Sequence, residues 1–364
     1  MDKKRNEYNY WFLGGACFLA YAACYSGRGI LSAMIPQILQ ETSLKKELLG
    51  NMGSAFFFSY GMGQLINGFV GDCVRPKYMV GLGLFLAGLV TCGFPMFHST
   101  IVQTILWGVC GLCCSMLWGP LSKVIAENTP EKMGRLFMTC LTAASLIGTA
   151  TTYVIAAIVS PMGSWRIAFW IVGAFLMITG VLWYIFFTVL EKSGLESLRQ
   201  VKYEEKGQAE AFTIDQGFIF MVIVSLLNGI IRNAVVFWIP TYITEKFNVS
   251  TAMAASISTA LPLVNLLGTF MAFWLLAKMK DNEKGVLAVL FGLSAFLFAL
   301  MYLIDGRFFF ITLASLFLAS APMTGACNMI FSVFCLRYTS TGRVSSIAGF
   351  LNFTGYLAAS LASS

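Results

Sequence analysis

The sequence predicts an all-α membrane protein that crosses the bilayer about eleven times, because apolar runs of roughly 20 residues recur along it. Hydrophobic residues make up 58% of the chain and charged residues 11%, and the mean hydropathy is +0.76. A soluble domain carries about 25% charged residues. Short turns with Gly, Pro or charged residues separate the apolar runs. The net charge of +7 comes from basic residues that gather in the turns of one side, so it does not indicate nucleic-acid binding.

The first half of the chain predicts six helices. Lys3, Lys4 and Arg5 place the N-terminus in the cytoplasm, since cytoplasmic segments are enriched in basic residues. We expect no cleavable signal peptide, because the first helix can start translocation itself. His98, the single histidine, falls in a short turn and is not expected to be catalytic. The predicted helices lie at about 11–38, 48–72, 78–97, 100–127, 135–160 and 165–190.

A polar stretch, Glu191–Asp215, interrupts the pattern and is predicted to be a cytoplasmic linker between an N-terminal bundle (1–190) and a C-terminal bundle (216–364). A twelfth helix is missing from this prediction, so the second bundle is incomplete. We interpret the chain as a fragment or truncated product of a protein with two six-helix bundles. The predicted helices of the second half lie at about 216–243, 251–278, 285–303, 307–335 and from 345 onward.

One basic residue lies inside an apolar segment of each half. Arg28 is followed by Ile35–Pro36, and Arg232 is followed at the same spacing by Ile239–Pro240. An unpaired guanidinium at mid-membrane costs about 2.5–3.5 kcal/mol on insertion scales. Two such arginines at matching positions indicate one central anion site. The alternative is that each arginine bonds backbone carbonyls or extends toward the membrane surface.

Acidic residues do not offer these arginines a partner, because every Asp and Glu is predicted in a loop or at a helix end. Buried charges are normally paired, so the missing partner is most simply an anionic ligand. A guanidinium suits bidentate binding of phosphate or carboxylate. No mid-membrane Asp, Glu or His is available to titrate, which favours anion exchange over proton coupling. No nucleophile–base pair, metal cluster or cofactor motif is present, so we expect no enzyme, no metal and no cofactor.

Polar side chains accompany the first arginine. Tyr25 and Tyr21 lie three and seven residues before Arg28, on its helical face. They either line the anion pocket or pack at a seam between helices. Gln64 in the second helix can add a neutral donor.

A second cluster lies where the second predicted helix ends, in the run Gly68-x3-Asp72-x2-Arg75-Pro76-Lys77. Asp72 can accept hydrogen bonds across the cytoplasmic face from arginines or helix N-termini. Asp72, Arg75 and Lys77 are therefore predicted to form a gate that holds one conformer and breaks in the other. The alternative is ordinary topogenic charge with a surface ion pair worth about 0–1 kcal/mol.

These motifs together resemble the major facilitator superfamily, and within it the organophosphate:phosphate antiporters, which include glycerol-3-phosphate and hexose-6-phosphate carriers. The resemblance covers nearly the whole chain and implies the major facilitator fold of two six-helix bundles. It also implies a phosphate site at Arg28 and Arg232, with Tyr25, Tyr21 and Tyr356 as pocket residues. The motifs are Tyr21-x3-Tyr25-x2-Arg28, Tyr60-Gly-x2-Gln64-x3-Gly68-x3-Asp72, Trp118-Gly119-Pro120, Arg232-x5-Trp238-x-Pro240-Thr241-Tyr242, Ala348-Gly349-Phe350 and Gly355-Tyr356.

The chain departs from this family at two places. Gln64 stands where some members carry a lysine, and Ala144 or Ser145 stands where the glycerol-3-phosphate type carries a histidine. The site therefore has less positive charge than in those members, which leaves room for a less charged anion.

The sequence supports three functions. The first is exchange of a phosphorylated small organic molecule, such as a sugar phosphate or glycerol phosphate, for inorganic phosphate by alternating access. The second is transport of an organic carboxylate, and the third is a transporter-like sensor of phosphorylated sugars. We expect a multi-pass monomer in the plasma membrane with no nucleic-acid partner.

Overall fold

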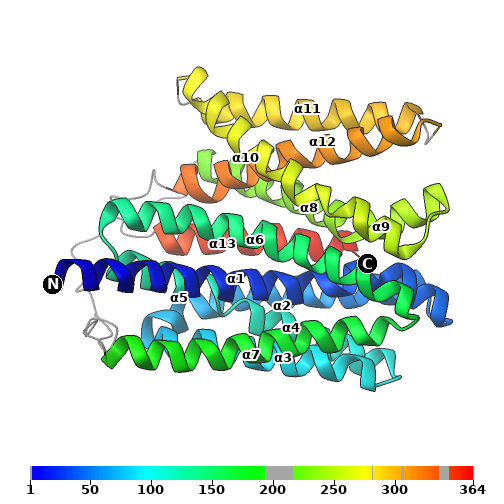
Figure 1. Ribbon diagram of the computed structural model, residues 1–364. Coiled ribbons are helices and arrows are strands. Elements are labelled where there is room, and N and C mark those ends of the chain that lie inside the picture. Colours follow the sequence, from blue (N-terminus) through cyan, green and yellow to red (C-terminus); the bar gives the residue numbers. More distant parts are fainter. Residues whose placement is uncertain (1, 193–215, 281, 305–306, 336–343, 364) are drawn as a thin grey trace.

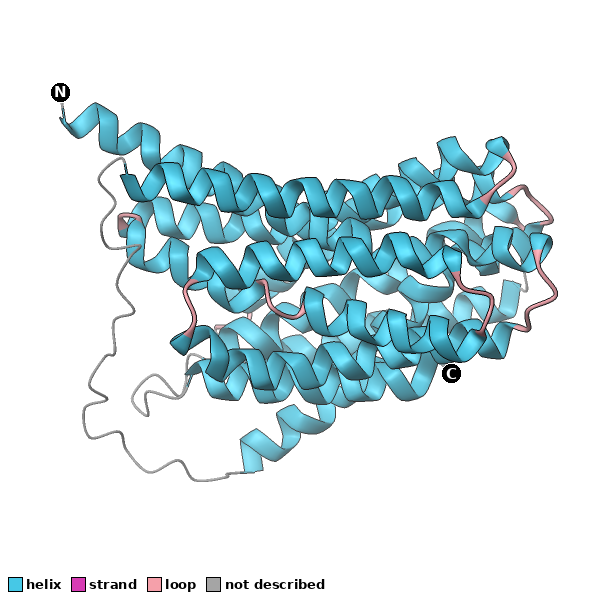
Figure 2. Ribbon diagram, turned by 90° about the horizontal axis from the view of Figure 1, so that it is seen from below, coloured by secondary structure: helices cyan, strands magenta, loops and turns pink. Residues whose placement is uncertain are grey.

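The computed structural model describes residues 2–192, 216–280, 282–304, 307–335 and 344–363 (Figures 1 and 2). In these ranges the chain is helical and contains no strand, as Figure 2 shows. The helices run side by side along one direction, and the connecting turns gather at the two ends of the bundle (Figure 1). We call the end at which α1 begins the N-side and the opposite end the far side. The predicted linker at 191–215 lies outside the described residues except for Glu191 and Lys192, so the division into two bundles stays a prediction.

The described helices agree with the predicted order and, within a few residues, with most predicted bounds. The first seven are α1 (Asp2–Glu41), α2 (Lys46–Cys73), α3 (Pro76–Gly93), α4 (Thr100–Cys114), α5 (Trp118–Asn128), α6 (Glu131–Val159) and α7 (Trp165–Lys192). The others are α8 (Gln216–Phe247), α9 (Thr251–Ser258), α10 (Ala260–Lys278), α11 (Glu283–Ile304), α12 (Phe309–Asn328) and α13 (Val344–Ser363).

Two predicted helices are broken in the structure. The predicted helix at 100–127 divides into α4 and α5, and that at 251–278 divides into α9 and α10. Each second piece carries a proline near its start, Pro120 and Pro262. Proline lacks an N–H and clashes with the preceding turn, so it loosens the helix just before it. Each pair still forms one candidate span, so the thirteen described helices correspond to the eleven predicted segments, eight of which are candidate membrane spans.

The outer surface of the bundle is apolar. Eight spans are long and apolar enough to cross a membrane by length and composition. Large hydrophobic side chains lie exposed along them, and Tyr302, Leu303 and Phe310 are 76–83% exposed. Contiguous exposed apolar surface of this extent indicates contact with lipid. The chain is therefore a multi-pass membrane protein.

Glycines allow close approach of the helices that carry the two arginines. α1 packs on α6, and α8 packs on α13. A Cβ at Gly148 of α6 would lie 2.2 Å from the carbonyl oxygen of Ala22 on α1. A Cβ at Gly229 of α8 would lie 2.0 Å from the carbonyl oxygen of Gly355 on α13. Small residues at such crossings let helix backbones touch in a membrane protein, which fixes the position of each arginine.

Candidate substrate site

Arg28 on α1 is surrounded by aromatic rings from α1, α2 and α13. Its Nη1 atom is buried and has no hydrogen-bond partner. A cation within about 6 Å of a ring centroid is attracted by the ring's quadrupole, so the rings partly compensate the buried charge. The distances from Arg28 Cζ to the ring centroids are 4.6 Å for Tyr60, 4.8 Å for Tyr356, 5.2 Å for Tyr25, 5.8 Å for Phe57 and 6.0 Å for Phe56.

Arg232 on α8 is close enough for its charge to act on Arg28, Tyr25, Tyr356 and Cys327. The two predicted arginines therefore lie on neighbouring helices and interact electrostatically. Among the described residues no carboxylate forms a salt bridge with either of them. Two like charges in a low-dielectric site repel each other, so an anion between them would be bound strongly.

The two predicted tyrosines of α1 form a pair beside Arg28. The hydroxyl of Tyr21 donates to that of Tyr25 at 3.5 Å, and their ring centroids lie 5.0 Å apart. The ring of Tyr21 also packs against Trp118 of α5 at 5.3 Å. Tyr25 therefore contacts the arginine directly, whereas Tyr21 supports Tyr25 from the N-side. The ring of Tyr356 contacts that of Tyr60 at 4.7 Å between centroids. α13 thus contributes to the five rings around Arg28 (Tyr25, Phe56, Phe57, Tyr60 and Tyr356), which we call the Arg28 cage.

Gln64 lies one helical turn after Tyr60 on α2, and its Nε2 atom is buried without a hydrogen-bond partner. Asn67, one turn further, differs because it donates to the hydroxyl of Ser115 at 2.7 Å and so links α2 to α4. Gln64 therefore has a buried donor that is free to bind a ligand and stays a predicted site residue, while Asn67 is a packing group.

The halves of the chain are joined between the arginines and the far side. Ser32 Oγ donates to the carbonyl oxygen of Phe237 at 2.6 Å, which connects α1 to α8. Ser54 and Ser360 each donate to the other's carbonyl oxygen, at 2.6 and 2.9 Å, which connects α2 to α13. We call the level of Arg28 and Arg232 in the bundle the arginine layer. The serine bonds lie on the helical turns between this layer and the far side.

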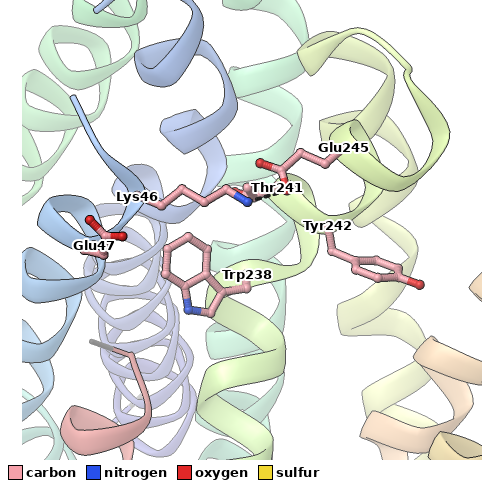
Figure 3. Close-up of a pocket in the computed structure, with 6 residues that line it drawn as sticks. All are labelled: Lys46, Glu47, Trp238, Thr241, Tyr242 and Glu245. Carbon is pink, nitrogen blue, oxygen red and sulfur yellow. Dashed lines mark hydrogen bonds and ion pairs between the residues drawn. The ribbon is translucent and has the colours of Figure 1, made fainter. Parts of the chain in front are cut away.

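An ion pair spans the same seam at the surface of the far side. Lys46, at the start of α2, pairs with Glu245, near the end of α8. Figure 3 shows the lysine reaching across to the glutamate above the indole of Trp238. These residues, with Glu47, Thr241 and Tyr242, line a hollow of about 320 Å³. Both ion-pair partners are about half exposed, so this contact can open at little cost.

The predicted gate is only partly described. The side chain of Asp72 lies outside the described part of the structure. Arg75 and Lys77 both bind Glu191, near the end of α7, and Lys77 Nζ lies 3.2 Å from Glu191 Oε2. Glu191 was missed in the sequence, where it was assigned to the linker. Its position directly after a long apolar helix on the basic side was the available signal.

The sequence also missed Phe56 and Phe57, which complete the ring set around Arg28. Phenylalanines are common in membrane helices, so composition gives no signal for them. Spacing does, because Phe56 lies four residues and Phe57 three residues before Tyr60, which puts all three on one helical face.

A family model of the Major Facilitator Superfamily matches residues 17–363. Three curated relatives are similar over most of the chain. The "Probable hexose phosphate transport protein" of Chlamydia pneumoniae is 22% identical over 82% of this chain and 71% of its own length. The "Glycerol-3-phosphate transporter" of Bacillus subtilis is 23% identical over 94% and 82%. The "Membrane sensor protein UhpC" of Escherichia coli is 22% identical over 98% and 85%.

Solved structures show the same fold. A bacterial homologue of the human lysosomal transporter Spinster has a TM-score of 0.75 at 15% identity, covering 97% of this chain and 80% of that one. The xylose transporter XylE from E. coli has a TM-score of 0.72 at 13% identity, covering 97% and 90%. At these identities the likeness concerns the fold alone. The relatives are transporters and a sensor, not enzymes.

Proposed function

The chain belongs to the Major Facilitator Superfamily, and from this premise we propose that it exchanges a phosphorylated small organic molecule for inorganic phosphate. The observation that carries the proposal is the pair Arg28 and Arg232, which lie on the neighbouring helices α1 and α8 and interact electrostatically without a carboxylate partner among the described residues. A phosphate ester at neutral pH carries up to two negative charges, which matches two guanidinium groups. The hexose phosphate and glycerol-3-phosphate relatives support the same substrate class.

Exchange follows from the cost of the empty site. Closing a dry cavity around two unneutralised cations is unfavourable, because both lose water and repel each other. A bound anion removes that repulsion and contacts α1 and α8 together. Such a ligand stabilises the closed arrangement more than the open one, and this differential affinity is what shifts a conformational equilibrium. A loaded carrier therefore changes conformation, and an empty one does not.

The contacts between the halves support alternating access. The serine bonds and the Lys46–Glu245 pair close the far side. The N-side carries Lys3, Lys4, Arg75 and Lys77, and such an excess of basic residues favours the cytoplasm. We infer that the N-terminus is cytoplasmic, that the protein lies in the plasma membrane, and that the structure corresponds to a state closed toward the outside.

The test is counterflow in proteoliposomes. Vesicles that contain the purified chain are loaded with inorganic phosphate or with phosphate-free buffer alone, and labelled phosphate is added outside. The proposal predicts uptake only into phosphate-loaded vesicles, and no uptake when a pH gradient is imposed on unloaded ones. Uptake that a pH gradient drives without internal anion would contradict exchange. Inhibition by an organic carboxylate but not by organic phosphates would favour the carboxylate alternative.

The similarity to a membrane sensor over 98% of this chain supports a second candidate, ligand sensing without transport. It predicts that organic phosphate stabilises the protein against heat while labelled phosphate does not enter loaded vesicles. Measuring thermal stability and flux on the same preparation therefore separates the two functions.

A further inference from the structure

Three carboxamide residues, which we call the amide layer, each lie one helical turn toward the N-side from Arg232 or from a tyrosine that contacts Arg28. Gln64 lies four residues after Tyr60 on α2. Asn228 lies four residues before Arg232 on α8, and Asn352 four residues before Tyr356 on α13. Residues four apart share a helical face, and α2 runs opposite to α8 and α13. All three amides are therefore displaced in the same direction from the arginine layer.

Close packing brings these helices together at this level. α13 lies between α2 and α8 and contacts both. On one side, a Cβ at Gly61 of α2 would lie 3.1 Å from Tyr356 of α13. On the other, Ser225 Oγ of α8 donates to the carbonyl oxygen of Leu351 of α13 at 2.7 Å. The helix positions that carry the amides are thus fixed by contacts less than two turns away.

Two of the three amides have buried polar atoms without a partner. Gln64 Nε2 is an unused donor, and Asn228 Oδ1 is an unused acceptor on a residue that is 2% exposed. Asn67 and Asn233 differ, because their amides donate to Ser115 Oγ and to the Gly229 carbonyl. Buried polar groups are almost always hydrogen-bonded, so unused groups at a ligand site indicate what the ligand brings.

The three amides are uncharged, and each can both donate and accept hydrogen bonds. A carboxamide has an acceptor oxygen and a donor NH₂, and a hydroxyl group both donates and accepts. Within one turn of the amides, α2, α8 and α13 carry no charged residue other than Arg232. The layer therefore suits hydroxyl groups rather than a second phosphate, a carboxylate or an amine.

We propose that Gln64, Asn228 and Asn352 bind the organic part of the substrate and select phosphate esters that carry hydroxyl groups. This inference rests on the proposed function, because it needs the phosphoryl group at Arg28 and Arg232. The ester then points from the arginines toward the N-side, and its hydroxyls meet the unused amide donor and acceptor. A site built to hydrogen-bond a hydroxyl discriminates strongly against an analogue that lacks it, since its own polar groups are then left unpaired.

The test compares two three-carbon phosphate esters that differ only in hydroxyl groups, glycerol 3-phosphate and propyl phosphate. Each is titrated as the external partner of labelled internal phosphate in proteoliposomes. In the wild type, propyl phosphate should need about a tenfold higher concentration for half-maximal exchange, the effect of one well-formed hydrogen bond. Gln64→Met and Asn352→Ala should each reduce that ratio severalfold, and the ratio is read within each variant, so that a change in its phosphate self-exchange affects both esters alike.

Gln40→Met is the matched control, because Gln40 is an exposed glutamine at the end of α1 away from this layer. It should keep the wild-type ratio. Should Gln64→Met lose phosphate self-exchange through misfolding, Gln64→Asn, which keeps the amide but withdraws it by one methylene, must still reduce the ratio. A wild-type ratio near one overturns the inference, and so does a ratio that stays unchanged in folded variants. A wild type without phosphate self-exchange would instead refute the proposed function itself.

Discussion

Arg28 and Arg232 occupy matching positions in the two halves, yet their surroundings differ. Arg28 has five aromatic rings within 6.0 Å of its Cζ atom. For Arg232 the structure gives no ring contact of this kind within the described ranges, and its neighbours include Cys327 and Tyr356. Arg28 is therefore stabilised before the ligand arrives, whereas Arg232 depends more on the ligand for compensation of its charge.

Removing the charge of Arg28 or of Arg232 should have the largest effect on the stability of the protein. At a phosphate concentration 100 times the Kd, binding should stabilise the wild type by about 2.7 kcal/mol. Arg28→Gln and Arg232→Gln should both lose that stabilisation. Without phosphate the variants should differ: Arg28→Gln should melt lower, because its ring contacts are lost, and Arg232→Gln should melt at or above the wild type. Equal melting shifts of the two ligand-free variants, measured by differential scanning fluorimetry in detergent, would contradict the proposed difference.

The glycine crossings that position the two arginine helices provide the next test. Gly148→Ala and Gly229→Ala each place a Cβ within 2.2 Å of a facing carbonyl oxygen. Overpacking of this kind costs about 1–3 kcal/mol, so both variants should give less monodisperse protein after detergent extraction. Gly15→Ala is the control, because its Cβ would have no neighbour within 4 Å. Size-exclusion profiles that match the control would show that these crossings are not tight.

Tyr356 tests the contribution of the second half to the Arg28 cage. Its ring lies 4.8 Å from Arg28 Cζ. A desolvated cation–π contact is worth about 2 kcal/mol, so Tyr356→Ala should weaken phosphate binding roughly 10- to 30-fold. Tyr356→Phe keeps the ring and should lose less. Isothermal titration of the two variants measures the difference, and equal losses would assign the effect to the hydroxyl group instead.

The smallest effect is expected at the far side. Lys46 and Glu245 are each 47% exposed, and exposed ion pairs contribute about 0–1 kcal/mol. Lys46→Gln and Glu245→Gln should therefore change exchange rates by less than about fivefold, and the double variant should resemble either single one. Abolished exchange in one single variant would mean that this pair has a role beyond closing the seam.

The fold was predictable from sequence because it depends on local pattern. The length of the apolar runs predicted the order of the helices, and the repeated spacing from Arg28 to Pro36 and from Arg232 to Pro240 placed each arginine inside a long helix, α1 or α8. That the two arginines form one anion site stays a prediction. The helix breaks before Pro120 and Pro262 were missed, because Pro36 and Pro240 show that proline also occurs inside a continuous helix.

The rest of the site depends on which helix faces which, and the sequence carries no direct signal for that. Phe57 joins the Arg28 cage only because α2 presents it to α1, and Asn352 joins the amide layer only because α13 lies between α2 and α8. The partner of Arg75 and Lys77 was missed for the same reason, since Glu191 is more than 100 residues away along the chain.

Phosphate self-exchange in phosphate-loaded proteoliposomes tests most directly whether Arg28 and Arg232 hold one anion together. It is measured for the wild type, Arg28→Lys and Arg232→Lys. Lysine keeps the charge but loses the bidentate fork that holds a phosphoryl group. If one anion is held by both arginines, each variant should lose about 30- to 150-fold in exchange, the scale of one lost charge-assisted contact of 2–3 kcal/mol, while remaining folded. Wild-type exchange in either folded variant would show that the anion is not held between the two halves.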